Sequence, residues 1–126
     1  MIELIAGRRV FAYARPTDLR KGYDGLSALV EQELGASPLS GDLYLFVSRN
    51  RERAKILYWD GSGLCILMKR LERGRFASLW ARREGELVKL SRAELALFLE
   101  GSEVVGRKRL VPEEMSLREL AITAQM

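Results

Sequence analysis

Residues 55–76 contain the clearest structural signal in the chain and read Lys-Ile-Leu-Tyr-Trp-Asp-Gly-Ser-Gly-Leu-Cys-Ile-Leu-Met-Lys-Arg-Leu-Glu-Arg-Gly-Arg-Phe. Two apolar runs, Ile56–Trp59 and Leu64–Met68, are too short for ordinary helices and are rich in residues that favour strands. Between them, Asp60 and Gly61 supply the backbone conformations that a tight reversal requires. We therefore predict a β-hairpin, which leads directly into a cluster of basic residues.

Further strands and two helices are predicted around this hairpin. The segment Leu43–Val47 has no alternating polar residues, which predicts a strand covered on both faces. Shorter apolar runs predict strands at residues 10–14 and 87–90, and helical periodicity appears at 23–34. Ser91-Arg92-Ala93-Glu94 matches a capping box at the start of a second helix. The segment 71–80 is ambiguous between a short helix and irregular chain.

These elements predict an α+β fold. Its sheet is an antiparallel β-meander of four to five strands, with strands 43–47, 54–59 and 64–69 in succession. Two main helices and a C-terminal arm complete it. With 126 residues the chain is long enough for one compact domain, which we place at residues 1–103. Residues 104–126 form a tail whose segment from Glu113 to Thr123 is either an interaction helix or a frayed end.

The chemistry that an active site needs is sparse in this chain. The sequence has no histidine and a single cysteine, Cys65, which its apolar surroundings predict to be a small core residue. The only aspartates are Asp18, Asp24, Asp42 and Asp60, all at positions typical of caps or turns. Neither a βαβ pattern nor a Gly-x-x-x-x-Gly-Lys run is apparent. We expect no enzyme activity, no metal and no cofactor.

The N-terminal sequence lacks the charged start and long apolar run of a signal peptide. No apolar run approaches the ~18 residues of a membrane span. We therefore expect a protein of the reducing cytoplasm that does not contact a membrane.

Positive charge is concentrated in one part of the chain. The net charge is only +4, but residues 48–83 contain ten Lys and Arg against three acidic residues. The rest of the chain is slightly acidic. This asymmetry favours an anionic partner, of which nucleic acid is the commonest, although an unevenly charged solvated surface is about equally consistent.

The predicted meander brings two basic connectors together. Because the strand 64–69 returns toward the connector 48–53, Lys69, Arg70 and Arg73 should approach Arg49 and Arg51. The resulting basic rim would contact phosphates, which are recognised by charge. The candidate nucleic-acid-binding residues are Arg49, Arg51, Arg53, Lys69, Arg70, Arg73 and Arg75, with Arg20 and Lys21 as second candidates.

Apolar residues away from the rim are candidates for protein contacts. Tyr58 and Trp59 lie near the opposite end of the hairpin, where they are core residues or partner anchors. In the tail, Met115, Leu117 and Leu120 give an imperfect apolar stripe.

The segment from Lys55 to Phe76 resembles the central motif of the TnpB proteins, the products of the second open reading frame of the insertion sequence 66 family. The resemblance continues in Thr17-Asp18-Leu19-Arg20-Lys21-Gly22 and in Leu90 to Gly101, and covers roughly residues 1–103. It implies a bacterial accessory protein required for transposition, acting beside a larger transposase that carries the catalytic acidic residues.

The sequence therefore suggests a non-catalytic accessory factor for DNA recombination by a transposable element. In the first hypothesis it binds DNA, such as the element ends, and assists the transposase. In the alternative it is a protein-interaction module that docks on the transposase or forms a homo-oligomer without contacting DNA.

Overall fold

The computed structural model describes residues 6–80 and 87–101. In chain order it contains β1 (Val10–Pro16), α2 (Tyr23–Gln32), β2 (Leu43–Val47), β3 (Arg53–Trp59), β4 (Leu64–Arg70), β5 (Leu87–Leu90) and α3 (Arg92–Glu100). The predicted α+β class is confirmed, with five strands and two helices in the described residues. The predicted C-terminal arm lies outside them.

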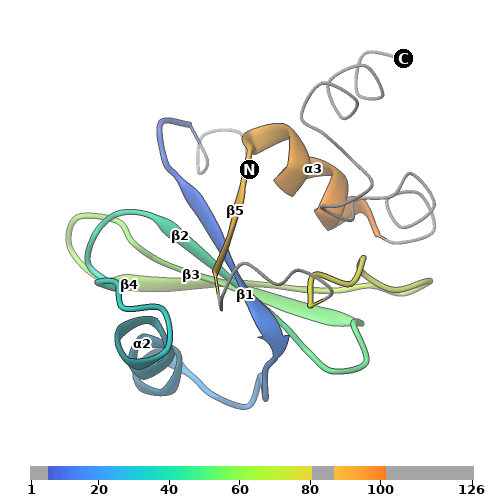
Figure 1. Ribbon diagram of the computed structural model, residues 1–126, viewed down its shortest axis with the longest axis horizontal. Coiled ribbons are helices and arrows are strands. Elements are labelled where there is room, and N and C mark those ends of the chain that lie inside the picture. The colour runs from blue at the N-terminus through green and yellow to red at the C-terminus, as the bar shows by residue number, and fades with distance from the viewer. Residues whose placement is uncertain (1–5, 81–86, 102–126) are drawn as a thin grey trace.

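The five strands form one mixed sheet in the order β4-β3-β2-β1-β5. The meander predicted for β2, β3 and β4 is present, and both of its pairings are antiparallel. β1, however, runs parallel to β2, with Val10 opposite Leu43. The prediction of a purely antiparallel sheet is thus corrected. The cause is α2, which carries the chain back across the sheet before β2 begins (Figure 1).

β1, α2 and β2 make up a βαβ unit, so the expectation that this pattern is absent was wrong. The unit differs from a nucleotide-binding one in the turn that follows β1. That turn reads Thr17-Asp18-Leu19-Arg20-Lys21-Gly22, and lacks the run of glycines that lets a backbone wrap a phosphate.

The sheet is covered on both faces, with α2 on one side and α3 on the other (Figure 1). On the α2 side, Leu26 and Val30 pack with Tyr44, Phe46 and Leu57. The larger core lies on the α3 side. All five residues of β2 are buried, as expected for a strand between two layers.

The segment that sequence patterns left ambiguous contributes to this larger core. Residues 71–80 contain neither helix nor strand, yet Phe76 and Leu79 are almost completely buried. The ring of Phe76 stacks on that of Phe98 in α3, with 4.9 Å between centroids. Irregular chain therefore supplies part of the core on the α3 side.

A side chain bonds to the backbone at each end of α3. The predicted capping box is formed, because the Ser91 hydroxyl accepts from the Glu94 amide and the Glu94 carboxylate accepts from the Ser91 amide. At the other end, the Lys69 ammonium donates to the Leu99 carbonyl at 2.6 Å. This contact ties β4 to α3 across the sheet.

Candidate nucleic-acid interface

Two basic connectors meet at one end of the sheet. The amide of Leu71 donates to the carbonyl of Glu52 at 2.9 Å, which extends the β3–β4 ladder by one bond. Farther along, the Phe76 amide donates to the Arg51 carbonyl at 2.7 Å, and the Arg51 guanidinium donates to the Phe76 carbonyl at 3.1 Å. The segments 48–53 and 70–76 are thereby fixed against each other.

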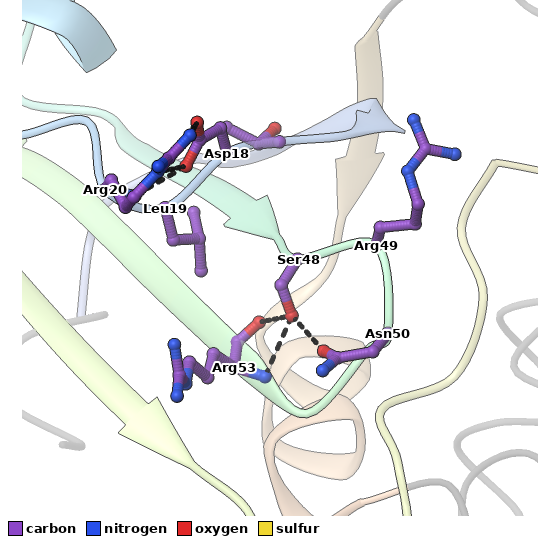
Figure 2. A pocket seen from close by; sticks show the side chains of 8 residues that line it. Asp18, Leu19, Arg20, Ser48, Arg49, Asn50 and Arg53 are labelled. Atoms are coloured by element: carbon purple, nitrogen blue, oxygen red, sulfur yellow. Dashed lines mark hydrogen bonds and ion pairs between the residues drawn. The ribbon is translucent and has the colours of Figure 1, made fainter.

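The β2–β3 turn is shaped by its own polar side chains. The Ser48 hydroxyl donates to the Asn50 side chain at 2.8 Å and accepts from the Arg53 amide at 3.1 Å. Arg51 adopts a left-handed conformation with φ of 60°, which a non-glycine residue rarely takes. Arg49 and Arg53 consequently extend from different sides of the turn, as Figure 2 shows.

An open hollow of about 490 Å³ lies between this turn and the loop after β1. Its lining residues are Thr17, Asp18, Leu19, Arg20, Ser48, Arg49, Asn50 and Arg53. Arg20 folds back onto Asp18, with 2.7 Å between Nη2 and Oδ2 (Figure 2). The hydrogen bonds from the Arg20 side chain and then its amide hold the pKa of Asp18 well below its ordinary value. The carboxylate therefore offsets Arg20, whereas no acidic side chain among the described residues forms an ion pair with Arg49 or Arg53.

Arg53 and Arg70 are direct cross-strand neighbours in the β3–β4 pair. Like charges in this arrangement repel each other and destabilise a sheet. Arg70 is relieved in part by Glu72, at 3.2 Å, but both of those side chains are largely exposed, so the pair is weak. A bound anion would relieve the repulsion more effectively.

The predicted basic residues fall into three groups according to the contacts of their side chains. Arg51 and Lys69 bind backbone carbonyls and hold the fold together. Arg20, Arg70 and Arg75 lie beside acidic side chains, Arg75 at 4.0 Å from Glu52. Within the described part of the chain, the side chains of the remaining four make no hydrogen bond or ion pair; they are Lys21, Arg49, Arg53 and Arg73.

The convergence expected from the meander is therefore present in the backbone, but not every cation at this end is available to a ligand. Arg82 and Arg83, which contributed to the basic segment, lie outside the described residues. Sequence reasoning missed the roles of Ser48 and Asn50, which shape the turn. The run Ser48-Arg49-Asn50 between two strands was the available signal, since Ser and Asn favour turns.

The predicted partner anchors lie at the opposite end of the sheet. Tyr58 packs against the core on the α3 side, and the Arg8 guanidinium lies 5.5 Å from the centre of its ring. Arg8 also donates to the carbonyls of Gly41 and Trp59, at 2.7 and 3.0 Å. Trp59 is half-buried and lines a second hollow here. Met115, Leu117 and Leu120 lie outside the described residues.

Two of the four aspartates, Asp18 and Asp60, make the turn contacts that were expected of them. Asp60 accepts hydrogen bonds from the amides of Ser62 and Gly63 in the hairpin turn, both at 2.9 Å. Asp42 pairs with Arg9, and Asp24 lies in the first turn of α2. Cys65 is half-buried on the edge strand, 3.5 Å from the Asp60 carboxylate, so its assignment as a core residue was wrong.

The described residues have neither a cluster of metal-binding side chains nor a membrane-spanning helix. They contain no group of three or more His, Cys, Asp or Glu side chains that could hold a metal ion. They also contain no helix long and apolar enough to cross a bilayer.

Comparison with known proteins assigns the chain to a family. The model of the family described as "IS66 Orf2 like protein" matches residues 8–109, most of the sequence. The chain belongs to the IS66 Orf2-like family. The chain is 38% identical over 93 residues to Uncharacterized protein y4hO of Sinorhizobium fredii strain NBRC 101917 / NGR234, covering 74% of this chain and 79% of that protein. To Uncharacterized protein y4jC of the same strain it is 41% identical over 76 residues, or 60% and 65% of the two chains. No solved structure matches.

Family membership confirms the resemblance seen in the sequence. An IS66 Orf2-like protein is an accessory component of the transposition of an insertion sequence. The match covers both basic connectors and both helices of the fold.

The environment of Asp60 leads to a testable pH dependence. Hydrogen bonds from the Ser62 and Gly63 amides lower the pKa of Asp60 below its ordinary 3.8. Its stabilising contribution is therefore fully present above that value and is lost as the pH falls through the lowered pKa. We expect Asp60→Asn, which retains the acceptor oxygen but cannot titrate, to show a melting temperature that falls less than wild type between about pH 5 and pH 2.

Asp60→Ala provides the comparison, because it removes the acceptor as well as the charge. It should melt below both other proteins at neutral pH. Identical acid dependence in wild type and Asp60→Asn would show that the pKa of this carboxyl is the same in the folded and unfolded chains, which would contradict the prediction.

Proposed function

We propose that this IS66 Orf2-like protein binds duplex DNA through phosphate contacts at the basic end of its sheet, and that it assists the transposase of the same element in this way. The observation that carries the proposal is the placement of Arg53 directly opposite Arg70, beside the hollow that Arg49 also lines. Such a juxtaposition costs stability in the free protein, and a phosphate between the two guanidinium groups would offset that cost.

The chemistry of the surrounding residues supports the same ligand. Arg49, Arg73 and Lys21 are exposed and have no acidic partner among the residues described. Asn50 supplies a side-chain amide of the kind that accompanies phosphate contacts, with one of its two N–H bonds directed at Glu52. The hollow is shallow and has no set of convergent catalytic groups, so the proposed role is binding without chemistry.

The first experiment measures how DNA affinity depends on salt. Each phosphate contact contributes about −0.9 to the slope of log K against log salt concentration. Arg49→Gln/Arg53→Gln should therefore make the slope less steep by about 1.8 and weaken binding at low salt. The measurement is fluorescence anisotropy with a labelled duplex over a range of salt concentrations.

Lys89→Gln/Arg92→Gln is the matched control. It removes the same amount of charge from exposed positions in β5 and at the start of α3. The slope of this control should stay at the wild-type value. If both double variants change the slope equally, only net charge matters and the proposed interface is wrong.

A second candidate function is docking on the transposase, and the half-buried Trp59 favours it. This side chain lines the hollow at the end of the sheet remote from the basic connectors, together with Arg8, Arg9 and Asp42. Aromatic residues in such positions commonly anchor protein partners. The two functions are compatible, because they use opposite ends of the sheet.

A pull-down with the purified transposase of the same element tests this second function. Trp59→Ala should reduce the amount of transposase retained, whereas Trp59→Phe should preserve it because an aromatic ring remains. A chain lacking residues 103–126 should be compared in parallel, to measure what the tail contributes. Failure of the wild-type chain to retain any transposase would exclude the docking function.

A further inference from the structure

β4 is one edge of the sheet, and among the described residues only β3 pairs with it. Hydrogen bonds at its two ends show which of its backbone groups face outward. At one end the Asp60 amide donates to the Gly63 carbonyl, and at the other the Leu71 amide donates to the Glu52 carbonyl. Because bonded and non-bonded pairs alternate in an antiparallel ladder, Cys65, Leu67 and Lys69 bond to β3. The amides and carbonyls that point away from the sheet belong to Leu64, Ile66, Met68 and Arg70.

This edge has little of the protection that sheet edges usually carry. It is seven residues long, whereas β5, the other edge, has four. Met68 near its middle is 50% exposed, and Ile66 and Leu67 are only half-buried. Lys69 and Arg70, the residues that discourage edge pairing, occupy one end of the strand. Leu64 and Cys65 at the other end are uncharged.

This distribution of charge makes the strand complementary to itself. We propose that β4 pairs antiparallel with β4 of a second copy of this chain, in a register centred on Leu67. Residue Leu64 then lies opposite Arg70 of the second copy, and Ile66 lies opposite Met68. All four outward-facing residues find bonding partners, and each such pair exchanges two backbone hydrogen bonds.

Two neighbouring registers are less favourable. A shift that centres the pairing on Met68 leaves Leu64 without a partner, and one centred on Lys69 places two ammonium groups opposite each other. In the register centred on Leu67, each Lys69 instead lies opposite Cys65 of the second copy. Cys65 is uncharged, so this register avoids placing like charges opposite each other.

Side-chain packing agrees with this arrangement. Alternation along β4 places Leu67 on the α3 side of the sheet, where it belongs to the core, and Ile66 on the α2 side. The two Leu67 side chains would meet at the two-fold axis. On the other face, Ile66 of each copy would cover the exposed Met68 of its partner. The dimer is independent of DNA binding, because none of these contacts requires an anion.

The first test blocks the edge without disturbing the fold. Met68→Pro removes an amide that points outward and plays no part in the β3–β4 ladder, so the monomer fold should tolerate it. Met68→Thr is the control, since it keeps the amide and a residue that favours strands. Sedimentation equilibrium at high micromolar concentration should give a dimer for wild type and Met68→Thr, and a monomer for Met68→Pro.

The second test reads the register directly. In a Cys65→Ser background, Leu67→Cys places two thiols in a non-hydrogen-bonded pair with Cα atoms about 4.5 Å apart, within reach of a disulfide. Oxidation should then give a covalent dimer on a non-reducing gel. Leu64→Cys in the same background is the control, because its two copies would lie about 20 Å apart.

The results distinguish a β4–β4 dimer from its alternatives even if Met68→Pro fails to fold. A covalent dimer formed through position 67 and not through position 64 supports the proposal on its own. A wild-type chain that stays monomeric at every concentration would overturn it. So would a dimer that a folded Met68→Pro leaves intact, or equal crosslinking through both positions. Binding of the transposase to the same edge in place of a second copy would also count against it.

Discussion

The reciprocal hydrogen bonds between Arg51 and Phe76 hold the basic end of this molecule together. They link the β2–β3 turn to the irregular segment that follows β4, beyond the point where the β3–β4 ladder ends. Phe76 is in turn fixed by its ring, which stacks on Phe98 in α3. The core on one face of the sheet thereby determines where the cationic connectors lie on its end.

This constraint divides the basic residues by role. Three of the cations donate hydrogen bonds to backbone carbonyls: Arg51, Lys55 and Lys69. Lys55 donates to the carbonyls of both Leu19 and Lys21. Each of the three brings two segments together, and each is a cation that a surface-charge argument would count as a ligand contact. The guanidinium groups of Arg49 and Arg53 are left at the edge of the hollow without carboxylate partners in the described residues. Some cationic side chains at this end therefore hold the fold together, and others remain exposed on its surface.

The sequence predicted the strongly patterned elements well. The hairpin, the buried β2 and the capping box at Ser91 each follow from local chemistry, and all are present. The parallel β1–β2 pairing was missed because strand direction depends on where the intervening helix packs, which local patterns do not encode. The signal available was length, since the 26 residues from 17 to 42 are ample for a crossover connection.

For the candidate interface, the sequence predicted where the basic connectors lie but not which of their side chains are available to a ligand. A meander dictates that residues 48–53 and 70–75 share one end of the sheet, and they do. Which of their cations remain exposed could not be read from the sequence. That outcome depends on partners far away in the chain, such as Phe76 for Arg51 and Leu99 for Lys69. Cys65 was misplaced for a related reason, because an apolar strand at the edge of a sheet is only half-buried.

We propose that DNA binds at the basic end of the sheet and not at the opposite end. Titration of the isotopically labelled protein with a short DNA duplex, followed by amide chemical shifts, tests it residue by residue. We expect the largest changes in residues 17–21, 48–53 and 70–75, with little change in the turn at 60–63 or in α3. Changes concentrated around Trp59 and residues 60–63, or spread evenly over the surface, would contradict it.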